Sequence, residues 1–397
     1  MKFYKIAIIG GGASGLTSAI ALKRAGFDDF VLLERLDRVG KKFISTGNGQ
    51  GNLSNTQIKQ DFYDGNDRSF VLPAIQKYGF NEIKDFYNFL GITLTEEDDG
   101  KVYPMSKQAS SVLDVMRAYL AYKNTNILTN FFVTDIKKTD DGYILTADNG
   151  EKLMANTILL CTGGQAQKQF GTDGNGYDLA KRFGHKITPV YPSLVQLKTD
   201  SPLIKGLRGL KADANVYAIS NGKVIKSAVG EVLFTDYGVS GNAIFKISGY
   251  LVKAKNPEVK ISFIPNLSFD ELVDKIENRF TTQPYLQVED ALTGLVNKQI
   301  GKQIIKTASD NSSYSIAFAT KNFILPITGN LGFNYAQVTK GGVSTTDIDQ
   351  FTMQSKLASN LYVLGELLDV DGDCGGYNLH WAFASAMSAV DDILKNI

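Results

Sequence analysis

A glycine-rich turn near the start of the chain has the spacing of a dinucleotide-binding loop. Gly10, Gly12 and Gly15 form the pattern GxGxxG between an apolar segment at residues 4–10 and a segment with helical spacing at residues 13–26. In such a turn the first glycine permits the sharp bend, the second lets the backbone approach a pyrophosphate, and the third lets helix and strand pack closely. The sequence therefore predicts a phosphate site at the N-terminus of this helix.

An acidic residue completes the pattern. Glu34 stands 19 residues after Gly15 and closes a second apolar segment, residues 30–34 (FVLLE). A carboxylate in this place accepts hydrogen bonds from both ribose hydroxyls, and its charge repels a 2′-phosphate. The sequence therefore predicts FAD or NAD rather than NADP.

Two later segments distinguish FAD from NAD. Residues 158–164 (ILLCTGG) have the pattern of a buried strand that ends in a small-residue turn, and residues 361–386 that of a strand, an acidic loop and a helix opened by Gly375 and Gly376. A second helix N-terminus favours the flavin end, because its partial positive charge stabilises the charge of a reduced flavin. A dinucleotide domain completed by the last segment of the chain is also more typical of FAD proteins. We therefore expect FAD.

Flavin chemistry also needs an acid or base, and two residues flank the glycine pair. His380 lies in the first turns of the predicted helix, which lowers its pKa, so it is either a proton shuttle or a packed histidine. Cys374 is either a proton donor tuned by the helix end or a small residue in a tight loop. Cys161 closes a buried strand and is expected in the core. A redox disulfide between the two cysteines is not expected, since flavin disulfide enzymes place both cysteines in one helix.

The surrounding pattern predicts the elements that position these residues. Apolar strands alternate with helical segments at both ends of the chain, which indicates a parallel α/β sheet. Between them lie alternating β segments and then helices, opened by a capping box at Ser268 and Glu271. Ser110 is the expected N-cap of an earlier helix. The predicted domains are an FAD-binding domain at 1–188 and 325–397, and an inserted substrate-side domain at 189–324, which is β-rich over 189–265 and helical over 266–324.

Composition limits the remaining possibilities. The chain of 397 residues has a formal net charge of +1, two cysteines and two histidines. This balance argues against strong non-specific attraction to nucleic acid, and so few cysteines and histidines predict no metal site. No apolar run approaches the ~20 residues of a membrane span, and no signal-peptide pattern is present. We expect a cytoplasmic protein without a membrane partner, and a monomer is favoured.

Seven ordered blocks of the sequence extend this interpretation. They are IIGGGASGL, RVGKKFISTGNG, DGKVYPMSKQASSVLDV, CTGGQA, GEVLFTDYGVSG, VTKGGVSTTDI and GELLDVDGDCGGYNLHWAFASA. With these blocks, the chain resembles the BaiN-like flavoproteins, or aminoacetone-oxidase-type FAD-binding family, over nearly its whole length. The resemblance implies an α/β, glutathione-reductase-like Rossmann FAD domain that is discontinuous and carries an inserted β-rich plus helical domain. It implies no second NAD(P) domain, and no second GxGxxG is present.

The resemblance also implies which residues contact the cofactor. For the ADP half these are Gly10, Gly12, Ala13, Ser14, Gly15, Glu34 and Arg35. For the pyrophosphate and flavin they are Lys41, Lys42, Thr46, Gly47, Asn48, Gly163 and Gly164. For the ribityl chain and isoalloxazine they are Gly365, Glu366, Asp369, Gly375, Gly376, Tyr377 and Asn378. Tyr237 lies in a block similar to the family's flavin-facing loop, so it is either a stacking or proton-donating residue or a tyrosine at a domain seam.

The chain departs from the family pattern at one place. Many members carry Arg-Cys in the stretch TGNGRCNLTN, where this chain has Gln50 and Gly51 in TGNGQGNLSN. A cysteine near the flavin is a natural acid for protonating a carbon during C=C reduction. Its absence here puts that chemistry, or that assignment of the acid, in doubt.

Two rows of basic residues raise the question of RNA binding. Lys298, Lys302 and Lys306 recur every four residues on a predicted helix, while Lys205, Arg208 and Lys211 recur every three. Such rows are more often solvated faces than binding surfaces, and we interpret them in this way.

The resemblance implies activities that differ widely in substrate: oxidation of aminoacetone, a reductive step on bile-acid rings, and reduction of a uridine in large-subunit ribosomal RNA. We favour an FAD-dependent oxidoreductase with hydride transfer at flavin N5, which reduces a polarised C=C, with uridine in large-subunit ribosomal RNA as the leading substrate and dihydrouridine as the product. NADH or NADPH is the expected transient electron donor. The alternatives are an oxidase of a small amine such as aminoacetone, and a flavin-bound RNA-binding or assembly factor with little turnover.

Overall fold

The structure, a computed structural model, describes residues 1–396 and divides into two compact units. Unit 1 comprises Met1–Tyr191 and Gln337–Ile397, and unit 2 comprises Pro192–Ala336. The expected second boundary, at residue 325, is too early. Strands β17 (Phe323–Pro326) and β18 (Gly329–Asn330) pair with the sheet of unit 2, so the chain leaves that unit only after residue 336.

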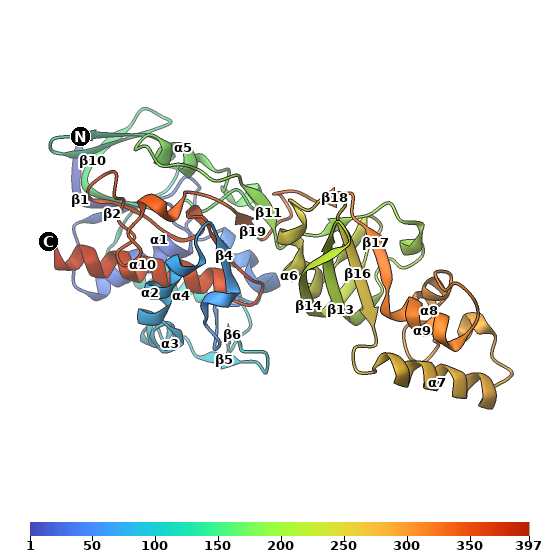
Figure 1. The fold of residues 1–397 in the computed structure, drawn as a ribbon. Helices are drawn as coiled ribbons and strands as arrows, with labels where there is room; N and C mark the ends of the chain where they lie inside the picture. The colour runs from blue at the N-terminus through green and yellow to red at the C-terminus, as the bar shows by residue number, and fades with distance from the viewer. Residues whose placement is uncertain (397) are drawn as a thin grey trace. The chain divides into compact units, whose positions relative to one another are not determined.

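A mixed sheet forms the core of unit 1 (Figure 1). Five strands run parallel in the order β7-β2-β1-β10-β20, and β9 and β8 continue from β10 as an antiparallel meander. Ile8 in β1 lies between Leu32 and Leu159, and all three are fully buried, as expected for strands covered on both faces. The strands are β1 (Lys2–Ile9), β2 (Phe30–Leu33), β7 (Asn126–Leu128), β8 (Val133–Thr139), β9 (Gly142–Ala147), β10 (Lys152–Leu160) and β20 (Leu361–Val363).

The helices of unit 1 include the two whose N-termini the sequence singled out. Helix α1 packs against α10 and α4. The helices are α1 (Ala13–Arg24), α2 (Leu72–Lys77), α3 (Phe80–Phe89), α4 (Ala109–Tyr122), α5 (Asn175–Lys181) and α10 (Tyr377–Lys395). The N-cap of α4 is Gln108 rather than Ser110, because the helix begins at Ala109 and Ser110 already lies inside its first turn.

Short strands and one irregular helix connect these elements. The 3₁₀ segment η1 spans Lys42–Gly49. Strand β21 pairs with β4, and β6 pairs with both β3 and β5. Their bounds are β3 (Ser54–Asn55), β4 (Tyr63–Gly65), β5 (Leu94–Glu96), β6 (Lys101–Pro104), β19 (Val338–Lys340) and β21 (Val370–Gly372).

Unit 2 combines an antiparallel sheet with a helical part. Its strands follow the order β17-β16-β13-β14-β15-β12-β18, and α6 (Asn242–Leu251) packs on β13 and β14. The other strands are β12 (Leu197–Lys198), β13 (Lys211–Ser220), β14 (Lys223–Phe234), β15 (Gly238–Ser240) and β16 (Glu258–Phe263). The other helices are α7 (Phe269–Thr282), α8 (Lys298–Ile305) and α9 (Ser313–Lys321). The predicted capping box is confirmed: Ser268 Oγ accepts from the N–H of Glu271, and the Glu271 carboxylate accepts from the N–H of Ser268.

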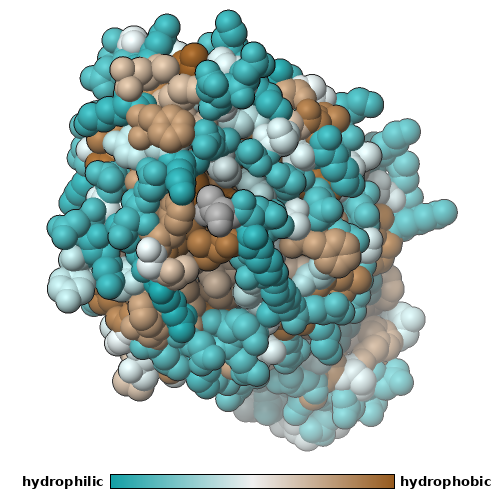
Figure 2. Space-filling model, turned by 90° about the vertical axis from the view of Figure 1, so that its left-hand side faces the viewer, coloured by the Kyte–Doolittle hydropathy of each residue, from teal (hydrophilic) through white to brown (hydrophobic). Residues whose placement is uncertain are grey.

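Apolar side chains of unit 1 are concentrated in its interior. Figure 2 shows one face of this unit, where hydrophilic residues cover most of the surface and hydrophobic residues form small separate groups. Within residues 1–396, no helix is long and apolar enough to cross a membrane.

Candidate functional site

The glycine turn between β1 and α1 has the geometry that a bound pyrophosphate needs. Gly10 has φ +105°, and a Cβ on it would lie 2.5 Å from the carbonyl oxygen of Cys161. A Cβ on Gly15 would overlap the carbonyl oxygen of Gly10, so only glycine lets α1 pack this closely. A Cβ on Gly12 would meet no atom within 4 Å. Gly10 and Gly15 are thus required by the packing of the turn itself, whereas Gly12 borders open space at the start of α1, where a pyrophosphate can approach the backbone.

Glu34 is held directly beside this turn. One of its carboxylate oxygens accepts from the N–H of Gly11 (2.9 Å), and the other accepts from the N–H of Leu36 (2.8 Å). Burial raises the pKa of Glu34, and these two backbone hydrogen bonds oppose the shift. Because a carboxylate has about four acceptor positions, both oxygens retain lone pairs for ribose hydroxyls.

Arg35, expected among the cofactor-binding residues, is committed to other parts of the protein. Its guanidinium pairs with Asp173 at 2.7 Å and lies 3.9 Å from the centre of the Phe132 ring. It also donates to the carbonyl oxygen of Gly171. This geometry favours a positioning role for the Arg35 side chain rather than a cofactor contact.

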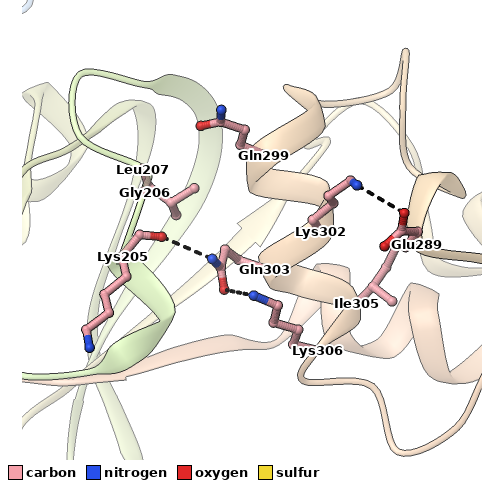
Figure 3. Close-up of a pocket in the computed structure, with 9 residues that line it drawn as sticks. All are labelled: Lys205, Gly206, Leu207, Glu289, Gln299, Lys302, Gln303, Ile305 and Lys306. Atoms are coloured by element: carbon pink, nitrogen blue, oxygen red, sulfur yellow. Dashed lines mark hydrogen bonds and ion pairs between the residues drawn. The ribbon is translucent and has the colours of Figure 1, made fainter.

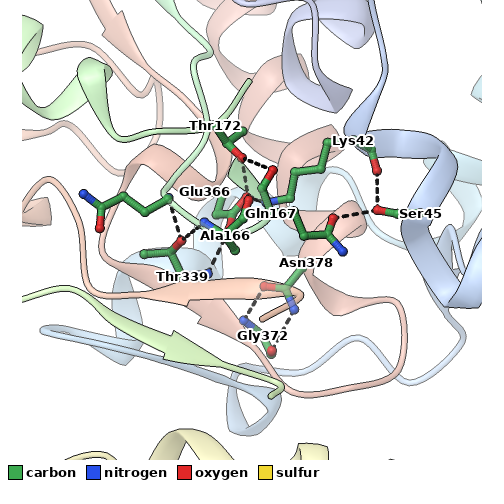
Figure 4. Close-up of polar contacts among 10 residues, drawn as sticks. Lys42, Ser45, Ala166, Gln167, Thr172, Thr339, Glu366, Gly372 and Asn378 are labelled. Atoms are coloured by element: carbon green, nitrogen blue, oxygen red, sulfur yellow. Dashed lines mark hydrogen bonds and ion pairs between the residues drawn. The ribbon is translucent and has the colours of Figure 1, made fainter. Parts of the chain in front are cut away.

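Two residues that were predicted to contact the cofactor, one from each end of the chain, form an ion pair (Figure 4). Lys42 Nζ lies 2.6 Å from Glu366 Oε2, and both side chains are about four-fifths buried. Glu366 Oε1 accepts from the N–H of Thr339 (2.9 Å), and Thr339 Oγ1 accepts from the N–H groups of Gln165 and Ala166. This network ties η1, the loop after β10, β19 and the segment after β20 together.

The predicted glycines of the later segments lie against the same network. A Cβ on Gly163 would lie 3.7 Å from Glu366 Oε2, and a Cβ on Gly164 would overlap the Thr339 hydroxyl. A Cβ on Gly365 would lie 3.1 Å from Ser14 Oγ, in the first turn of α1. The fold therefore brings the turn predicted for the ADP half next to the segments predicted for the flavin half.

The stretch at residues 46–51 forms an irregular turn. Gly47 and Asn48 both have left-handed backbone angles, and Thr46 Oγ1 donates to the carbonyl oxygen of Phe43. Lys41 pairs with Asp37 on the surface. Gly51 has φ +76°, and a Cβ on it would lie 3.0 Å from the Cα of Ala109. This backbone therefore disfavours any side chain at residue 51, where the resembling family has cysteine.

The start of α10 is clamped by side chains expected to face the cofactor. The Asn378 amide donates to the carbonyl oxygen of Gly372 (2.7 Å) and accepts from its N–H (2.8 Å). The Tyr377 ring stacks on Phe62, with ring centres 4.5 Å apart. Asn55 donates to the carbonyl oxygen of Gly375 (3.1 Å). The side chains of Asn378 and Tyr377 thus contact the protein and shape the loop. The N-terminus of α10, which has no side-chain cap, is the part of this segment that suits a ligand.

His380 has the environment of a packed histidine. It is fully buried, Nε2 lies 2.9 Å from the carbonyl oxygen of Tyr78, and Nδ1 lies 2.9 Å from Ser54 Oγ. Since a carbonyl only accepts, Nε2 carries the proton and Nδ1 accepts from Ser54. Burial lowers the pKa of His380 to about 4, although the bond to Tyr78 opposes this shift. These contacts favour the packed histidine over the proton shuttle, because both ring nitrogens are hydrogen-bonded within the protein and the side chain is fully buried.

This environment predicts how His380→Gln will behave. The variant loses packing and one hydrogen bond, which costs about 2 kcal/mol at pH 7. The lowered pKa makes wild-type stability fall as pH drops from about 6.5 towards 4, by about 3 kcal/mol from this group. Glutamine does not titrate there, so the deficit of the variant shrinks on acidification, as measured by urea unfolding at pH 7 and 4.5. Loss of an ionisation between pH 5 and 8 from the pH–rate profile of the variant would restore the shuttle interpretation.

The two cysteines and Tyr237 differ in accessibility. Cys161 is buried, and burial raises the pKa of its thiol to about 12, in keeping with the expected core role. Cys374 is partly exposed in the loop before Gly375. Tyr237 is 36% exposed in unit 2, between β14 and β15. Its role at the flavin stays a prediction.

Sequence reasoning missed a second polar cluster in unit 1. Asp64 in β4 lies opposite Asp371 in β21, and Lys340 Nζ lies 2.5 Å from Asp64 and 3.5 Å from Asp371. Asp369, which was expected at the flavin, is buried nearby, and burial raises its pKa. Asp64, Lys340 and Asp371 lie far apart in the sequence, so no short sequence pattern could indicate that they meet. Within residues 1–396, no cluster of histidine, cysteine, aspartate or glutamate suits a metal ion.

The residues of unit 1 fit FAD on two structural grounds. Gly12 leaves room for close backbone approach at the start of α1. Neither α1 nor α10 has an acidic residue in its first turn or a side-chain cap, so the positive ends of both helices are available to negative groups.

Comparison with known proteins places this geometry among flavoproteins. The family model described as HI0933-like protein Rossmann domain matches residues 4–392. The 3-dehydro-bile acid delta(4,6)-reductase of Clostridium scindens is 35% identical, over 97% of this chain and 98% of the relative. The ribosomal RNA dihydrouridine synthase of Escherichia coli is 25% identical, over 99% of both chains.

Solved structures support the same fold. The open conformation of a flavocytochrome c3 fumarate reductase matches with a TM-score of 0.52 and 15% identity, over 99% of this chain and 78% of that chain. The 3-ketosteroid delta1-dehydrogenase of Sterolibacterium denitrificans matches with a TM-score of 0.53 and 11% identity, over the whole of both chains. At these identities the likeness concerns the fold alone.

Proposed function

Because this chain belongs to the HI0933-like family of FAD-dependent oxidoreductases, we propose that it reduces a carbon–carbon double bond polarised by a neighbouring carbonyl. Its fold is the FAD-binding Rossmann-type α/β fold, discontinuous and with an inserted β-rich and helical part. The observation that supports the cofactor is the meeting of the Gly10–Gly15 turn, the Lys42–Glu366–Thr339 network and the start of α10 in unit 1, and the activities of the relatives support the double-bond reduction.

The protein's own residues divide the work of holding the cofactor. The N–H groups after Gly12 receive the pyrophosphate, and Glu34 receives the ribose hydroxyls. Lys42 is oriented by Glu366, which Thr339 holds in turn. When bound, FAD supplies hydride chemistry at N5, with NADH or NADPH as the expected electron donor.

Reduction of the double bond also requires a proton for the second carbon. Cys374 is the side chain we propose for this step, because it is partly exposed and lies two residues before the N-cap of α10. A helix N-terminus stabilises a thiolate, so the thiol can give up its proton. The burial of His380 argues against this residue as the proton donor.

We propose uridine in large-subunit ribosomal RNA as the leading substrate. Its uracil ring has a double bond conjugated to a carbonyl, and dihydrouridine is the ring after addition of a hydride and a proton. Two relatives, from Escherichia coli and Haemophilus influenzae, are ribosomal RNA dihydrouridine synthases. A second candidate is a steroid-like conjugated ketone, which the 35% identity with the bile acid reductase favours.

One experiment separates these substrates. Ribosomal RNA from a strain lacking the protein would be digested and analysed by mass spectrometry, with and without a plasmid copy. We expect one dihydrouridine to be lost and then restored by the wild-type copy but not by Gly12→Glu. In parallel, the reduced holoenzyme would be mixed without air with ribosomal RNA from that strain or with a 3-oxo-4,6-diene bile acid. Unchanged dihydrouridine, with flavin reoxidation by the steroid alone, would establish the second candidate instead.

A further inference from the structure

Two lysine-bearing segments of unit 2 meet at one pocket (Figure 3). The pocket has a volume of about 440 Å³, within the range of small-ligand sites. Residues 205–207 line one side, and residues of α8 line the other. Its polar lining consists of Lys205, Glu289, Gln299, Lys302, Gln303 and Lys306, of which Glu289 pairs with Lys302. The two basic rows noted in the sequence therefore contribute to the same site, although almost a hundred residues separate them.

Most of the basic residues in these rows are neutralised by acidic partners. Lys298 pairs with Asp290 (3.3 Å), Lys302 with Glu289 (3.1 Å), Arg208 with Asp236 (2.8 Å) and Lys211 with Glu231 (3.1 Å). For this majority the solvated-face interpretation is adequate. Lys205 and Lys306 differ, since the described residues 1–396 place no carboxylate within ion-pair distance of either ammonium group. One unneutralised lysine from each row thus lines the pocket.

A glutamine fixes the two segments relative to each other. Gln303 Nε2 donates to the carbonyl oxygen of Lys205 (3.0 Å), and Lys306 Nζ donates to Gln303 Oε1 (3.3 Å). The amide is uncharged, so Lys306 keeps its full positive charge while its side chain is oriented. Figure 3 shows Gln303 between the Lys205 backbone and the Lys306 side chain. The bridge therefore holds Lys306 beside the backbone of Lys205, while the Lys205 side chain extends away from α8 (Figure 3).

The composition of the pocket fits a phosphodiester backbone. Ammonium groups bind phosphate oxygens, and primary amides such as Gln299 can bind hydroxyl groups or base edges. The neighbouring helix α9 contacts α8 but contributes no residue to the lining of the pocket.

We propose that this pocket binds the phosphate backbone of single-stranded RNA through Lys205 and Lys306. The inference rests on the proposed function in that RNA is taken as the substrate, and it gives unit 2 the role of holding the strand. Neutralising two phosphates of a single strand contributes about −1.4 to the slope of log K against log salt, at about −0.7 per phosphate.

The test uses the FAD-loaded full chain and a fluorescent single-stranded RNA of about twenty nucleotides. Fluorescence anisotropy would give Kd from 50 to 300 mM salt. We expect the double variant Lys205→Gln/Lys306→Gln to bind about 10- to 30-fold more weakly and to show a salt slope smaller by about 1.4. The matched control is Arg208→Gln/Lys298→Gln, which removes the same charge from paired positions and should change Kd by less than about threefold.

Other outcomes would overturn the inference. Equal weakening by the two double variants would show that only net charge matters, and an unchanged Kd in the pocket variant would remove the pocket from RNA binding. Uridine monophosphate or inorganic phosphate that binds as tightly as the RNA would assign the pocket to a small anion. Thermal unfolding checks that both variants fold. Dihydrouridine formation by the wild type is measured separately. If the wild type forms no dihydrouridine but its RNA binding still depends on the pocket, the proposed function is rejected and the pocket inference stands.

Discussion

Replacing Gly12 with glutamate is expected to weaken FAD binding by about 10²- to 10³-fold while the apoprotein remains folded. A Cβ at this position meets no atom within 4 Å, and its backbone angles, φ −80° and ψ −164°, suit any residue. A glutamate there would place volume and negative charge where the pyrophosphate must approach. Two like charges about 4 Å apart cost roughly 4 kcal/mol at an effective dielectric constant of about 20, which corresponds to this loss of affinity.

Gly12→Gln is the matched control, since it adds almost the same volume without the charge. We expect it to weaken binding clearly less than Gly12→Glu and Gly12→Ala to weaken it least. Titration of apoprotein with FAD, followed by fluorescence, gives the affinities, and thermal unfolding of the apoproteins should differ by about 1 kcal/mol or less. A Gly12→Glu protein that keeps its FAD affinity within about threefold would show that the pyrophosphate does not lie at this turn.

Asp371→Asn is expected to stabilise the protein relative to wild type as the pH rises. Asp371 is 6% exposed, and its pKa is raised to about 7, first by burial and then by the carboxylates of Asp64 and Asp369, while Lys340 opposes the shift. The folded state therefore holds this proton more tightly than the unfolded state. The stabilisation is complete below the ordinary pKa near 4 and is lost as the pH rises through 7.

The size of this effect follows from the same shift. Between pH 5 and pH 8 the wild type should lose about 3 kcal/mol through this group, at about 1.4 kcal/mol per pKa unit. Asparagine has the same shape and does not titrate, so the difference between variant and wild type should grow by that amount. Urea unfolding of the apoproteins at several pH values measures it.

Asp64, which lies opposite Asp371 on the neighbouring strand, provides a control because its pKa is shifted in the opposite direction. Burial raises the pKa of Asp64, but its hydrogen bond and charge interaction with Lys340 outweigh burial and leave the pKa lowered. Asp64→Asn should therefore destabilise the protein at neutral pH, and its cost should shrink in acid. A constant offset between Asp371→Asn and wild type from pH 5 to pH 8 would mean that Asp371 is already ionised in the folded protein at pH 5.

Much of the dinucleotide-binding fold could be predicted because its signals are local. The GxGxxG turn, the apolar strands before and after it, and Glu34 lie within thirty-five residues, and each has a steric or electrostatic reason of its own. Strand and helix periods likewise gave β1, β2 and α10 to within a few residues at either end. The boundary at 325 failed because β17 has the same apolar pattern whichever sheet it joins.

The roles of individual polar residues could not be predicted in the same way. His380 and Cys374 both lie beside the glycine pair in sequence, yet one is fully buried and the other is partly exposed. Two evenly spaced rows of basic residues gave no sign that four members would be paired and that Lys205 and Lys306 would remain. Pairing and burial depend on which distant segment arrives beside a side chain.

The sequence by itself determined the cofactor class and the strand–turn–helix unit that receives it, because backbone sterics and residue spacing act over short distances. Only the tertiary structure decided which polar groups meet. Lys42 and Glu366 are 324 residues apart in the chain and 2.6 Å apart in space, and Thr339 joins them from a third segment. Such contacts arise when the sheet packs its helices and loops together, and burial then makes each charge depend on the partner that it finds.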